Sequence, residues 1–202
     1  MSTNSRDVVV VGGGIVGCLS AYLLSRRGLK VTVLEADSIG SHASGFAFGG
    51  LDPMNGVGLP DPLLEFSLWS YGRHRSLSRE LQETTGIDLH FRVQDRLPLA
   101  FDDGEVRAAK SDLDWMRGVG GFGVEWLDFQ NASDLEPLIN RECIGALHQQ
   151  GAGSLEPYRM VLAAVRAGER QGMSMLQRRV TGMESTGGRC TGVMVELSLI
   201  HI

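Results

Sequence analysis

Residues 12–17, Gly-Gly-Gly-Ile-Val-Gly, constrain the fold of this chain most, because three consecutive glycines directly follow an apolar run. The run itself, Val8 to Val11, consists of four valines, a pattern typical of a buried strand. Glycine is unfavourable inside strands and helices because it loses more conformational freedom on folding than any other residue. The three glycines therefore indicate a turn whose main chain another group approaches closely.

The residues after this turn predict a helix and a second strand. Residues 18–27 have a helical apolar pattern, and Gly28 stands where a helix commonly ends. Residues 31–34 predict a strand, and Glu35 follows it directly. Strand, glycine turn, helix, strand and acid in this order form the dinucleotide-binding βαβ unit.

Each part of this unit has a physical role in holding a nucleotide. Gly12 permits the tight turn, Gly14 lets a diphosphate approach the main chain, and Gly17 lets the helix pack closely on the strand. The free N–H groups at the helix N-terminus attract the phosphates. Glu35 can accept hydrogen bonds from two ribose hydroxyls, and its charge disfavours a 2′-phosphate, so NADP is the nucleotide that fits least well.

The composition of the 202-residue chain is that of an ordinary globular protein, with a net charge of -5. The sequence has no basic run, which argues against nucleic acid and anionic membranes as partners. The apolar stretch Val8 to Leu24 is interrupted by glycines, so we expect core structure and no transmembrane segment. The three cysteines and five histidines lack metal-binding spacing, so we expect no metal site. Three cysteines without CxxC spacing also argue for a reducing compartment, so we expect a cytoplasmic location.

Residues 36–51, ADSIGSHASGFAFGGL, form a loop of mostly small residues directly after Glu35. With the glycine turn, this loop resembles the N-terminus of the D-amino acid oxidase, glycine oxidase and sarcosine oxidase family of FAD-dependent oxidoreductases. In that family a hydroxyl residue and a late glycine of the loop meet the flavin, and Ser44 and Gly49 stand in those places. The resemblance therefore implies FAD as the cofactor.

The resemblance also implies which residues line the FAD. A valine main chain of the family touches the adenine, and Val180 stands at that position. Phe48 and Gly50 depart from the family, which usually has a smaller and a larger apolar residue there. The residues carried over are Gly12, Gly13, Gly14, Ile15, Val16, Gly17, Glu35, Ala36, Ala43, Ser44, Phe48, Gly49, Gly50 and Val180.

The expected fold is α/β: a Rossmann-like FAD-binding βαβ domain with an inserted α+β substrate domain on an antiparallel sheet, truncated at its C-terminus. Residues 1–86 and 151–196 are assigned to the FAD-binding domain and residues 87–150 to the first part of the substrate domain. The last six residues, 197–202, read LSLIHI and resemble a translated transposon end. We therefore expect them to be a non-native tail.

Other patterns predict the elements between these landmarks. An amphipathic helix is expected over 61–85, and apolar runs at 89–93 and 97–101 predict a hairpin. Asn131 or Ser133 is expected to cap a short helix. Further expectations are helices over 103–117 and after Pro157, strands at 124–127, 144–149 and 173–178, and a hairpin or meander over 183–195.

The resemblance implies oxidation of the C–N bond of a small amine or amino acid by hydride transfer to flavin, with oxygen or a quinone as electron acceptor. The family's substrate-binding residues lie mainly in its C-terminal half, so no catalytic residue is assigned here. A homo-oligomer stays open for the full-length protein. Two alternatives also stay open: an NAD-dependent dehydrogenase, which the βαβ unit would serve equally well, and a non-catalytic, truncated nucleotide-binding fragment.

Overall fold

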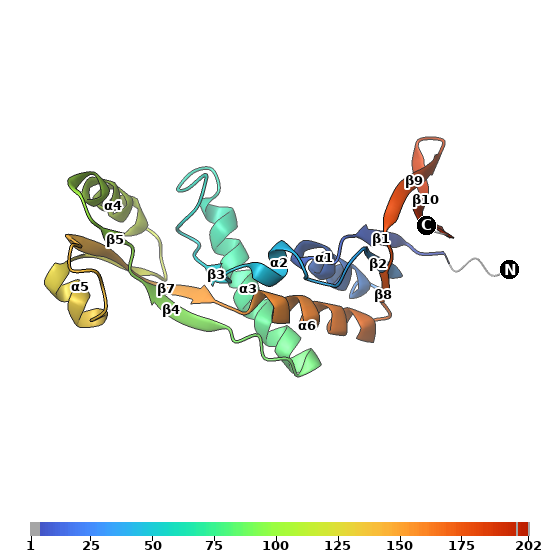
Figure 1. Cartoon of the computed structure of the whole chain (residues 1–202), viewed down its shortest axis with the longest axis horizontal. Coiled ribbons are helices and arrows are strands. Elements are labelled where there is room, and N and C mark those ends of the chain that lie inside the picture. The colour runs from blue at the N-terminus through green and yellow to red at the C-terminus, as the bar shows by residue number, and fades with distance from the viewer. Residues whose placement is uncertain (1–4, 197, 202) are drawn as a thin grey trace. The chain divides into compact units, whose positions relative to one another are not determined.

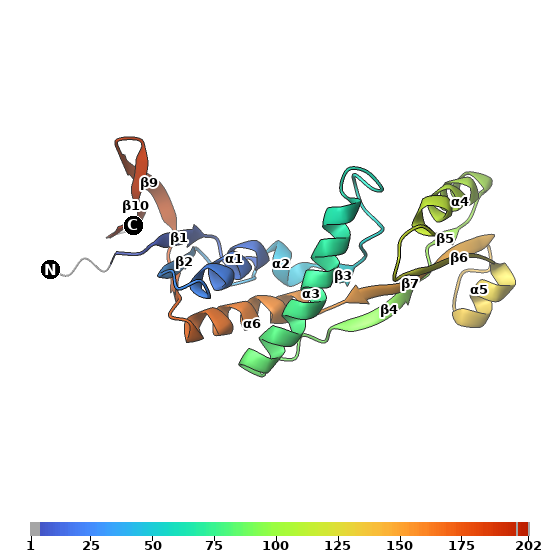
Figure 2. The ribbon, with the colours of Figure 1, turned by 180° about the vertical axis from the view of Figure 1, so that it is seen from behind.

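The computed structural model describes residues 5–196 and 198–201, and the chain divides into two compact units. Unit 1 comprises Met1–Gly49, Ser76–Leu89 and Glu156–Ile202, and unit 2 comprises Gly50–Arg75 and His90–Leu155 (Figures 1 and 2). The chain passes repeatedly between the two units, so neither unit is one continuous segment.

Unit 1 contains a parallel sheet with the strand order β1-β2-β8. Its strands are β1 (Val8–Val11), β2 (Val31–Glu35) and β8 (Ser174–Gln177). The central strand β2 is the most buried, as its apolar residues predict. Val11 pairs with Leu34, so β1 and β2 end at the same edge of the sheet. The predicted strand, turn, helix and strand are all present in this order.

Two helices of unit 1, α1 (Ile15–Ser25) and α6 (Pro157–Arg170), lie side by side (Figures 1 and 2). Helix α1 begins directly after the glycine turn, earlier than the predicted residue 18. A Cβ on Gly17 would lie 2.1 Å from the carbonyl oxygen of Gly12, so only glycine allows the helix to lie this close to the turn.

The helix α3 (Leu64–Thr85) confirms the helix predicted over 61–85, although it begins after Leu63. Its C-terminal part belongs to unit 1 and is bonded to α1. The hydroxyl of Tyr22 donates to Oε1 of Glu80, and Nη1 of Arg26 lies 2.7 Å from the same oxygen. These polar contacts and the buried side chain of Leu81 fix this part of α3 within unit 1.

The predicted meander of unit 1 is confirmed as an antiparallel sheet of order β11-β10-β9. Its strands are β9 (Val180–Thr186), β10 (Arg189–Val195) and β11 (Ser198–His201). Gly187 and Gly188 both have positive φ and form the turn between β9 and β10. Within the expected non-native tail, β11 pairs with β10, whereas Leu197 and Ile202 lie outside the described residues.

Unit 2 is built on the long strand β7 (Gly145–Ser154), which pairs antiparallel with four other strands. They are β3 (Gly50–Leu51), β4 (Arg92–Arg96), β5 (Leu99–Ala100) and β6 (Gly123–Asp128). The predicted hairpin between residues 89–93 and 97–101 is wrong, because β4 and β5 both pair with β7 and not with each other. The predicted strand at 144–149 is confirmed and extends to Ser154.

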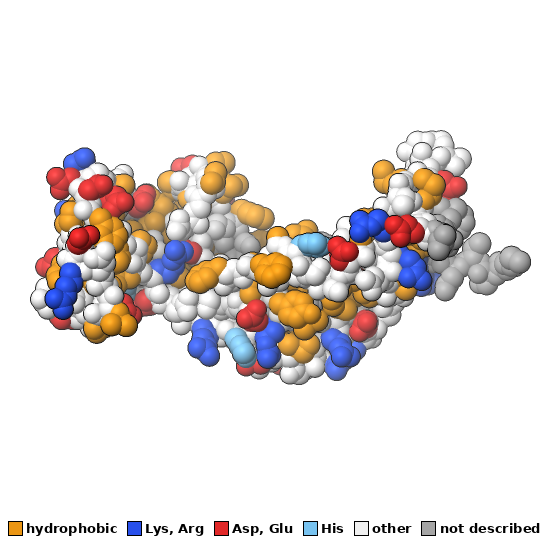
Figure 3. Space-filling view, in the orientation of Figure 1, with side chains coloured by type: hydrophobic (Ala, Val, Ile, Leu, Met, Phe, Trp, Pro, Cys, Tyr) orange, Lys and Arg blue, Asp and Glu red, His pale blue; other side chains and the backbone are white. Residues whose placement is uncertain are grey.

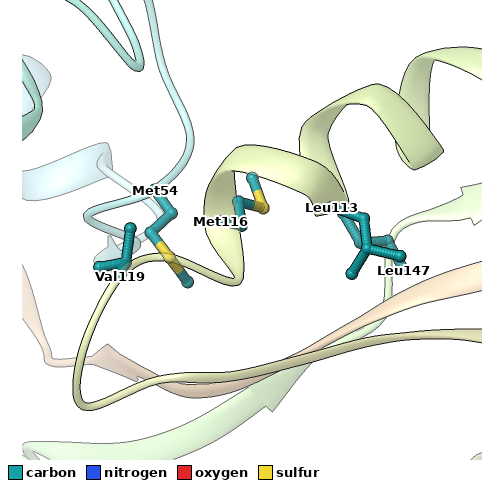
Figure 4. Packing of buried hydrophobic residues seen from close by; sticks show 5 residues of the cluster. All are labelled: Met54, Leu113, Met116, Val119 and Leu147. Carbon is teal, nitrogen blue, oxygen red and sulfur yellow. The ribbon is translucent and has the colours of Figure 1, made fainter.

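The core of unit 2 lies between β7 and the helix α4 (Asp103–Met116). Figure 4 shows this cluster, with Leu113 beside Leu147 and Val119 beside Met54. The helix was predicted over 103–117, and its apolar face supplies two members of the cluster. Burying these side chains stabilises unit 2 through the hydrophobic effect.

The short helix α5 (Phe129–Leu135) follows β6 in unit 2. Its cap is Asp128, whose Oδ1 accepts a hydrogen bond of 2.9 Å from the N–H of Asn131. The predicted caps Asn131 and Ser133 are therefore wrong, because both residues lie inside the helix. An aspartate can cap a helix as well as asparagine or serine, so residue type alone could not select the position.

Large apolar side chains remain exposed in both units, and Figure 3 shows several groups of them on one face. Phe46 and Phe48 of unit 1 are 85% and 92% exposed, and Trp69 of unit 2 is 62% exposed. Exposed aromatic groups of this size favour contacts with a ligand or another protein surface. No helix among the described residues has the length and apolar character needed to span a membrane.

His148 of β7 is buried between two carboxylates of neighbouring strands. Its Nε2 lies 2.9 Å from Oδ2 of Asp95, and its Nδ1 lies 3.1 Å from Oε1 of Glu125. Burial lowers the pKa of His148, but the hydrogen bonds and negative charges of the two carboxylates outweigh burial and raise the pKa above its ordinary value. His148 therefore links β4, β7 and β6, and it attracts the two carboxylates most strongly when its imidazole is protonated.

We predict that the contribution of His148 to the stability of unit 2 falls as the pH rises. Because its pKa is raised in the folded state, the stabilisation is present in full below the ordinary pKa of about 6.5 and is lost as the pH passes the higher folded value. The urea midpoints of wild type and His148→Gln should therefore differ more at acidic than at alkaline pH. An equal difference at both pH values would contradict the assignment.

We also predict that Gly17→Ala destabilises unit 1 by about 1–3 kcal/mol, because the added Cβ meets backbone that cannot move without displacing α1. The control is Gly72→Ala in α3, where a Cβ meets nothing within 4 Å. That substitution should be neutral or stabilise by about 0.5–1 kcal/mol. Urea unfolding of the three proteins measures both effects. Equal stability of Gly17→Ala and wild type would refute the role of Gly17.

Candidate nucleotide-binding site

The glycine turn lies at the edge of the sheet where β1 and β2 end. Gly12 has a φ of +106°, a conformation that L side chains rarely adopt. Its N–H donates to the carbonyl oxygen of Leu34 at 2.8 Å, which holds the turn against β2. Gly14 is the N-cap residue of α1, and as a glycine it has no side chain that could cap the helix. The turn therefore presents main chain without Cβ atoms at the helix N-terminus.

Glu35 points its carboxylate at this turn. Oε2 accepts a hydrogen bond of 2.6 Å from the N–H of Gly13, and Oε1 accepts one of 2.7 Å from the N–H of Asp37. The fit at Gly13 is tight, because a Cβ there would lie 3.0 Å from Cβ of Glu35 and 3.1 Å from Cε of Met175, so the two side chains would have to move by a few tenths of an ångström. The predicted acid and the predicted turn are thus in direct contact.

Glu35 is an ionised acceptor at neutral pH. Burial raises the pKa of its carboxyl, but hydrogen bonds from the N–H groups of Asp37, Gly13 and Ala36 outweigh burial and lower the pKa below its ordinary value. An ionised carboxylate offers only acceptor sites, each oxygen having more than one lone pair. It can therefore accept hydrogen bonds from the hydroxyl groups of a ribose.

Cys18 stays a neutral thiol behind the turn. Burial, and then the negative charge of Glu35, raise its pKa to about 11. Its Sγ donates to the carbonyl oxygen of Gly13 at 3.3 Å. Cys18 thus supports the turn from the buried side and is not a nucleophile at neutral pH.

The loop after Glu35 returns to the N-terminus of α1. The short helix α2 (Ala43–Phe46) carries Ser44, whose Oγ accepts a hydrogen bond of 2.9 Å from the N–H of Ile15. A Cβ on Gly14 would lie 3.1 Å from the same oxygen. The N–H groups of the first turn of a helix have no partner within the helix, so those of Val16 and Gly17 are suited to bind an anion.

Three residues near Glu35, namely Asp37, His42 and Arg179, are not among the predicted cofactor-binding residues. Oδ2 of Asp37 lies 2.9 Å from Nε2 of His42, and its Oδ1 lies 3.7 Å from Nη2 of Arg179. His42 and Arg179 thus hold Asp37 in place, and the N–H of Asp37 donates to Oε1 of Glu35. Asp37 stands two residues after the strand-ending acid, and this proximity was the only sequence signal of its role.

The remaining predicted cofactor-binding residues lie farther from the contact between Gly13 and Glu35. Val180 begins β9, and the N–H of Arg178 donates to the carbonyl oxygen of Glu35 at 2.7 Å, so the start of β9 lies near the end of β2. Ala36 and Ala43 flank the loop, and Gly49 has a φ of +81°. Phe48, which is predicted to line the FAD, has an exposed side chain. Gly50 begins β3 of unit 2 and lines a cavity of about 300 Å³ there.

The residues of unit 1 fit the ADP portion of a dinucleotide. The turn leaves no room for a Cβ at Gly17 and little at Gly13, the helix N-terminus offers N–H groups, and Glu35 offers an ionised acceptor. This arrangement can hold a diphosphate and a ribose. It provides binding and orientation, and the chemistry of a reaction would come from the bound group.

Comparisons with known proteins agree with this site. Residues 7–199 match the DAO family, described as FAD dependent oxidoreductase. The chain is 31% identical over 154 residues to the glycine oxidase of Geobacillus kaustophilus (strain HTA426), covering 76% of this chain and 41% of that protein. It is 29% identical over 184 residues to the glycine oxidase of Bacillus licheniformis, covering 90% of this chain and 48% of that protein. The chain thus spans about half the length of these curated relatives.

Solved structures support the same relationship. The crystal structure of glycine oxidase from Geobacillus kaustophilus superposes with a TM-score of 0.91 at 26% identity, covering 98% of this chain and 53% of that chain. Glycine oxidase from Bacillus cereus ATCC 14579 gives a TM-score of 0.88 at 25% identity, covering 98% of this chain and 54% of that chain. The predicted α/β fold and the predicted family are thereby confirmed, and this chain belongs to the DAO family of FAD-dependent oxidoreductases.

Proposed function

We propose that the whole protein uses FAD to oxidise the C–N bond of a small amine or amino acid. The observation that carries the proposal is the contact between Glu35 and Gly13, which sets an ionised acceptor beside the glycine turn. The names of the relatives support the substrate class, because two curated relatives that match this chain are glycine oxidases. FAD is the cofactor of the family.

Each proposed cofactor-binding residue has a physical role. The N–H groups of Val16 and Gly17 bind the diphosphate, Glu35 accepts hydrogen bonds from the ribose, and the main chain of Val180 contacts the adenine. Ser44 and Gly49 lie in the loop proposed to cover the remainder of the cofactor. The other residues proposed to line it are Ala36, Ala43, Phe48 and Gly50.

When bound, FAD would supply the oxidation by taking a hydride from the α-carbon of an uncharged amine, and water would hydrolyse the protonated imine that is left. Oxygen or a quinone is the proposed final electron acceptor. The described residues hold and orient the cofactor, and we assign no catalytic residue among them. We also propose that unit 2 contributes to the substrate domain, since its antiparallel sheet is separate from the nucleotide-binding sheet of unit 1.

We predict that Glu35→Gln weakens FAD binding to this chain roughly tenfold, because the amide loses the charge and one acceptor that meet the ribose. Isothermal titration calorimetry measures the affinity. The control is Glu169→Gln on α6, which neutralises an exposed carboxylate of the same unit and should leave the affinity unchanged. FMN lacks the AMP portion of FAD and therefore the ribose that Glu35 meets, so Glu35→Gln should not alter its binding. Equal FAD affinity of Glu35→Gln and wild type would remove the basis of the proposal.

We predict that the protein encoded by the complete gene is yellow when purified and loses its visible flavin absorbance when an amine such as glycine or sarcosine is added without oxygen. This 202-residue chain alone should form no peroxide with the same amines, because it spans about half the length of its relatives. Purification of the complete protein with bound NAD and no flavin would instead favour the dehydrogenase. Amine-dependent peroxide formation by the 202-residue chain would contradict its predicted inactivity.

A further inference from the structure

The cavity of about 300 Å³ in unit 2 lies between residues 50–59 and the N-terminal half of α3. Its wall begins at Gly50, and the preceding residue, Gly49, belongs to the loop proposed to cover part of the FAD. The chain therefore leads directly from the proposed cofactor site into this wall. The volume is at the lower end of the range of pockets that hold small molecules.

The wall of this cavity offers apolar surface that the folded unit leaves in contact with water. Val57 is 97% exposed, Phe66 is 65% exposed and Leu63 is 45% exposed. Leu51 and Leu59 belong to the same wall. Removing apolar surface from water is favourable, so an apolar group that enters the cavity is stabilised.

Two aromatic rings of α3, those of Phe66 and Tyr71, line the cavity, and each is held by a neighbour outside the wall. The ring of Phe66 stacks on that of Trp69, with the ring centroids 6.0 Å apart. The hydroxyl of Tyr71 donates to the carbonyl oxygen of Gly151 at 2.8 Å. These contacts fix the two rings in place, and ring surface favours apolar and aromatic partners.

The described wall residues offer no positive charge that could bind a carboxylate. They include no lysine or arginine, and burial lowers the pKa of His74, so its imidazole is neutral at neutral pH. The acidic wall residue is Asp52, whose side chain is 5% exposed and has both oxygens bonded. Its Oδ1 accepts from the N–H of Met54 at 3.0 Å, and its Oδ2 lies 2.7 Å from Nη1 of Arg96. The other polar side chains of the wall are uncharged, namely those of Asn55, Ser67 and Ser70. The wall therefore suits the uncharged, apolar part of a ligand.

We propose that this cavity holds the apolar side chain of the substrate, so that the protein prefers an amino acid or amine with a branched or aromatic group over glycine. The inference rests on the proposed function and deepens it by naming the substrate class. The apolar group lies against Leu63 and Phe66, and the amine and the carbon to be oxidised stay outside the wall. Glycine has no side chain to bury there, and filling such a pocket favours the larger substrate by about tenfold to hundredfold.

The kinetic test uses the complete protein and follows reduction of its flavin without oxygen by glycine, racemic leucine and racemic phenylalanine. We expect the second-order rate constant to be at least about tenfold higher for leucine and phenylalanine than for glycine. A rate constant for glycine that equals or exceeds the other two would overturn the proposal. Reduction by none of the amines would count against the proposed oxidation, and the binding test below would then decide the present inference.

The binding test is ligand-observed ¹⁹F NMR of the complete protein with 4-fluorobenzylamine and 2-fluoroethylamine, two amines that differ in the size of their apolar part. Any bound flavin is first reduced with dithionite, so that neither amine is consumed. We expect 4-fluorobenzylamine to bind at least about tenfold more tightly. Equal affinity for the two amines, or no binding of 4-fluorobenzylamine up to about 10 mM, would overturn the proposal.

Three variants locate the bound group. Phe66→Ala should weaken binding of 4-fluorobenzylamine about tenfold and leave that of 2-fluoroethylamine unchanged, whereas Phe66→Leu keeps an apolar side chain and should retain most of the affinity. The control Phe101→Ala removes an exposed phenylalanine of unit 2 outside the wall and should bind both amines as the wild type does. Circular dichroism checks that each variant is folded.

Equal affinity of Phe66→Ala and wild type for 4-fluorobenzylamine would show that the group does not lie in this cavity. The comparison of the two amines uses the wild-type protein alone, so it decides the question even where a variant fails to fold.

Discussion

The hydrogen bond from the N–H of Gly13 to Glu35 is the interaction on which the nucleotide site depends. It exists because β1 and β2 pair in parallel with Val11 opposite Leu34, which brings the two strand ends to one edge. A shift of this register by one residue would turn the carboxylate to the other face of the sheet. The site is therefore a product of strand register, and the buried residues of β2 that fix this register also fix the site.

The local parts of this architecture could be predicted from the sequence. The valines of β1, the three glycines and the acid after β2 lie within one short stretch, and each restricts the backbone or side chain by itself. The same holds for the helices α4 and α6, whose apolar periodicity extends over several turns. The predictions were correct for those elements whose structure is determined by their own residues.

Contacts between distant segments could not be predicted in this way. The bond between Ser44 and the N–H of Ile15 joins residues 29 positions apart, and residue type gives no sign of it. The runs 89–93 and 97–101 have the composition of a hairpin, but β4 and β5 lie at 92–96 and 99–100, and both pair with the long strand β7. Oε1 of Gln149 in β7 is buried without a hydrogen-bond donor among the described residues, which is likewise a property of the packed unit and has no sequence pattern.

The dependence of unit 2 on β7 has a consequence for the order of folding. The strands β3, β4, β5 and β6 precede β7 in the chain, and all of them pair with it. During synthesis these segments leave the ribosome before their common partner, so their backbone groups cannot form the native ladder until residue 154 has emerged. Sheets formed by such distant pairings fold slowly, and their unpaired edges are prone to association. The nascent chain is thus most exposed to aggregation shortly before β7 is complete, and a chaperone that covers strand edges would act at that moment.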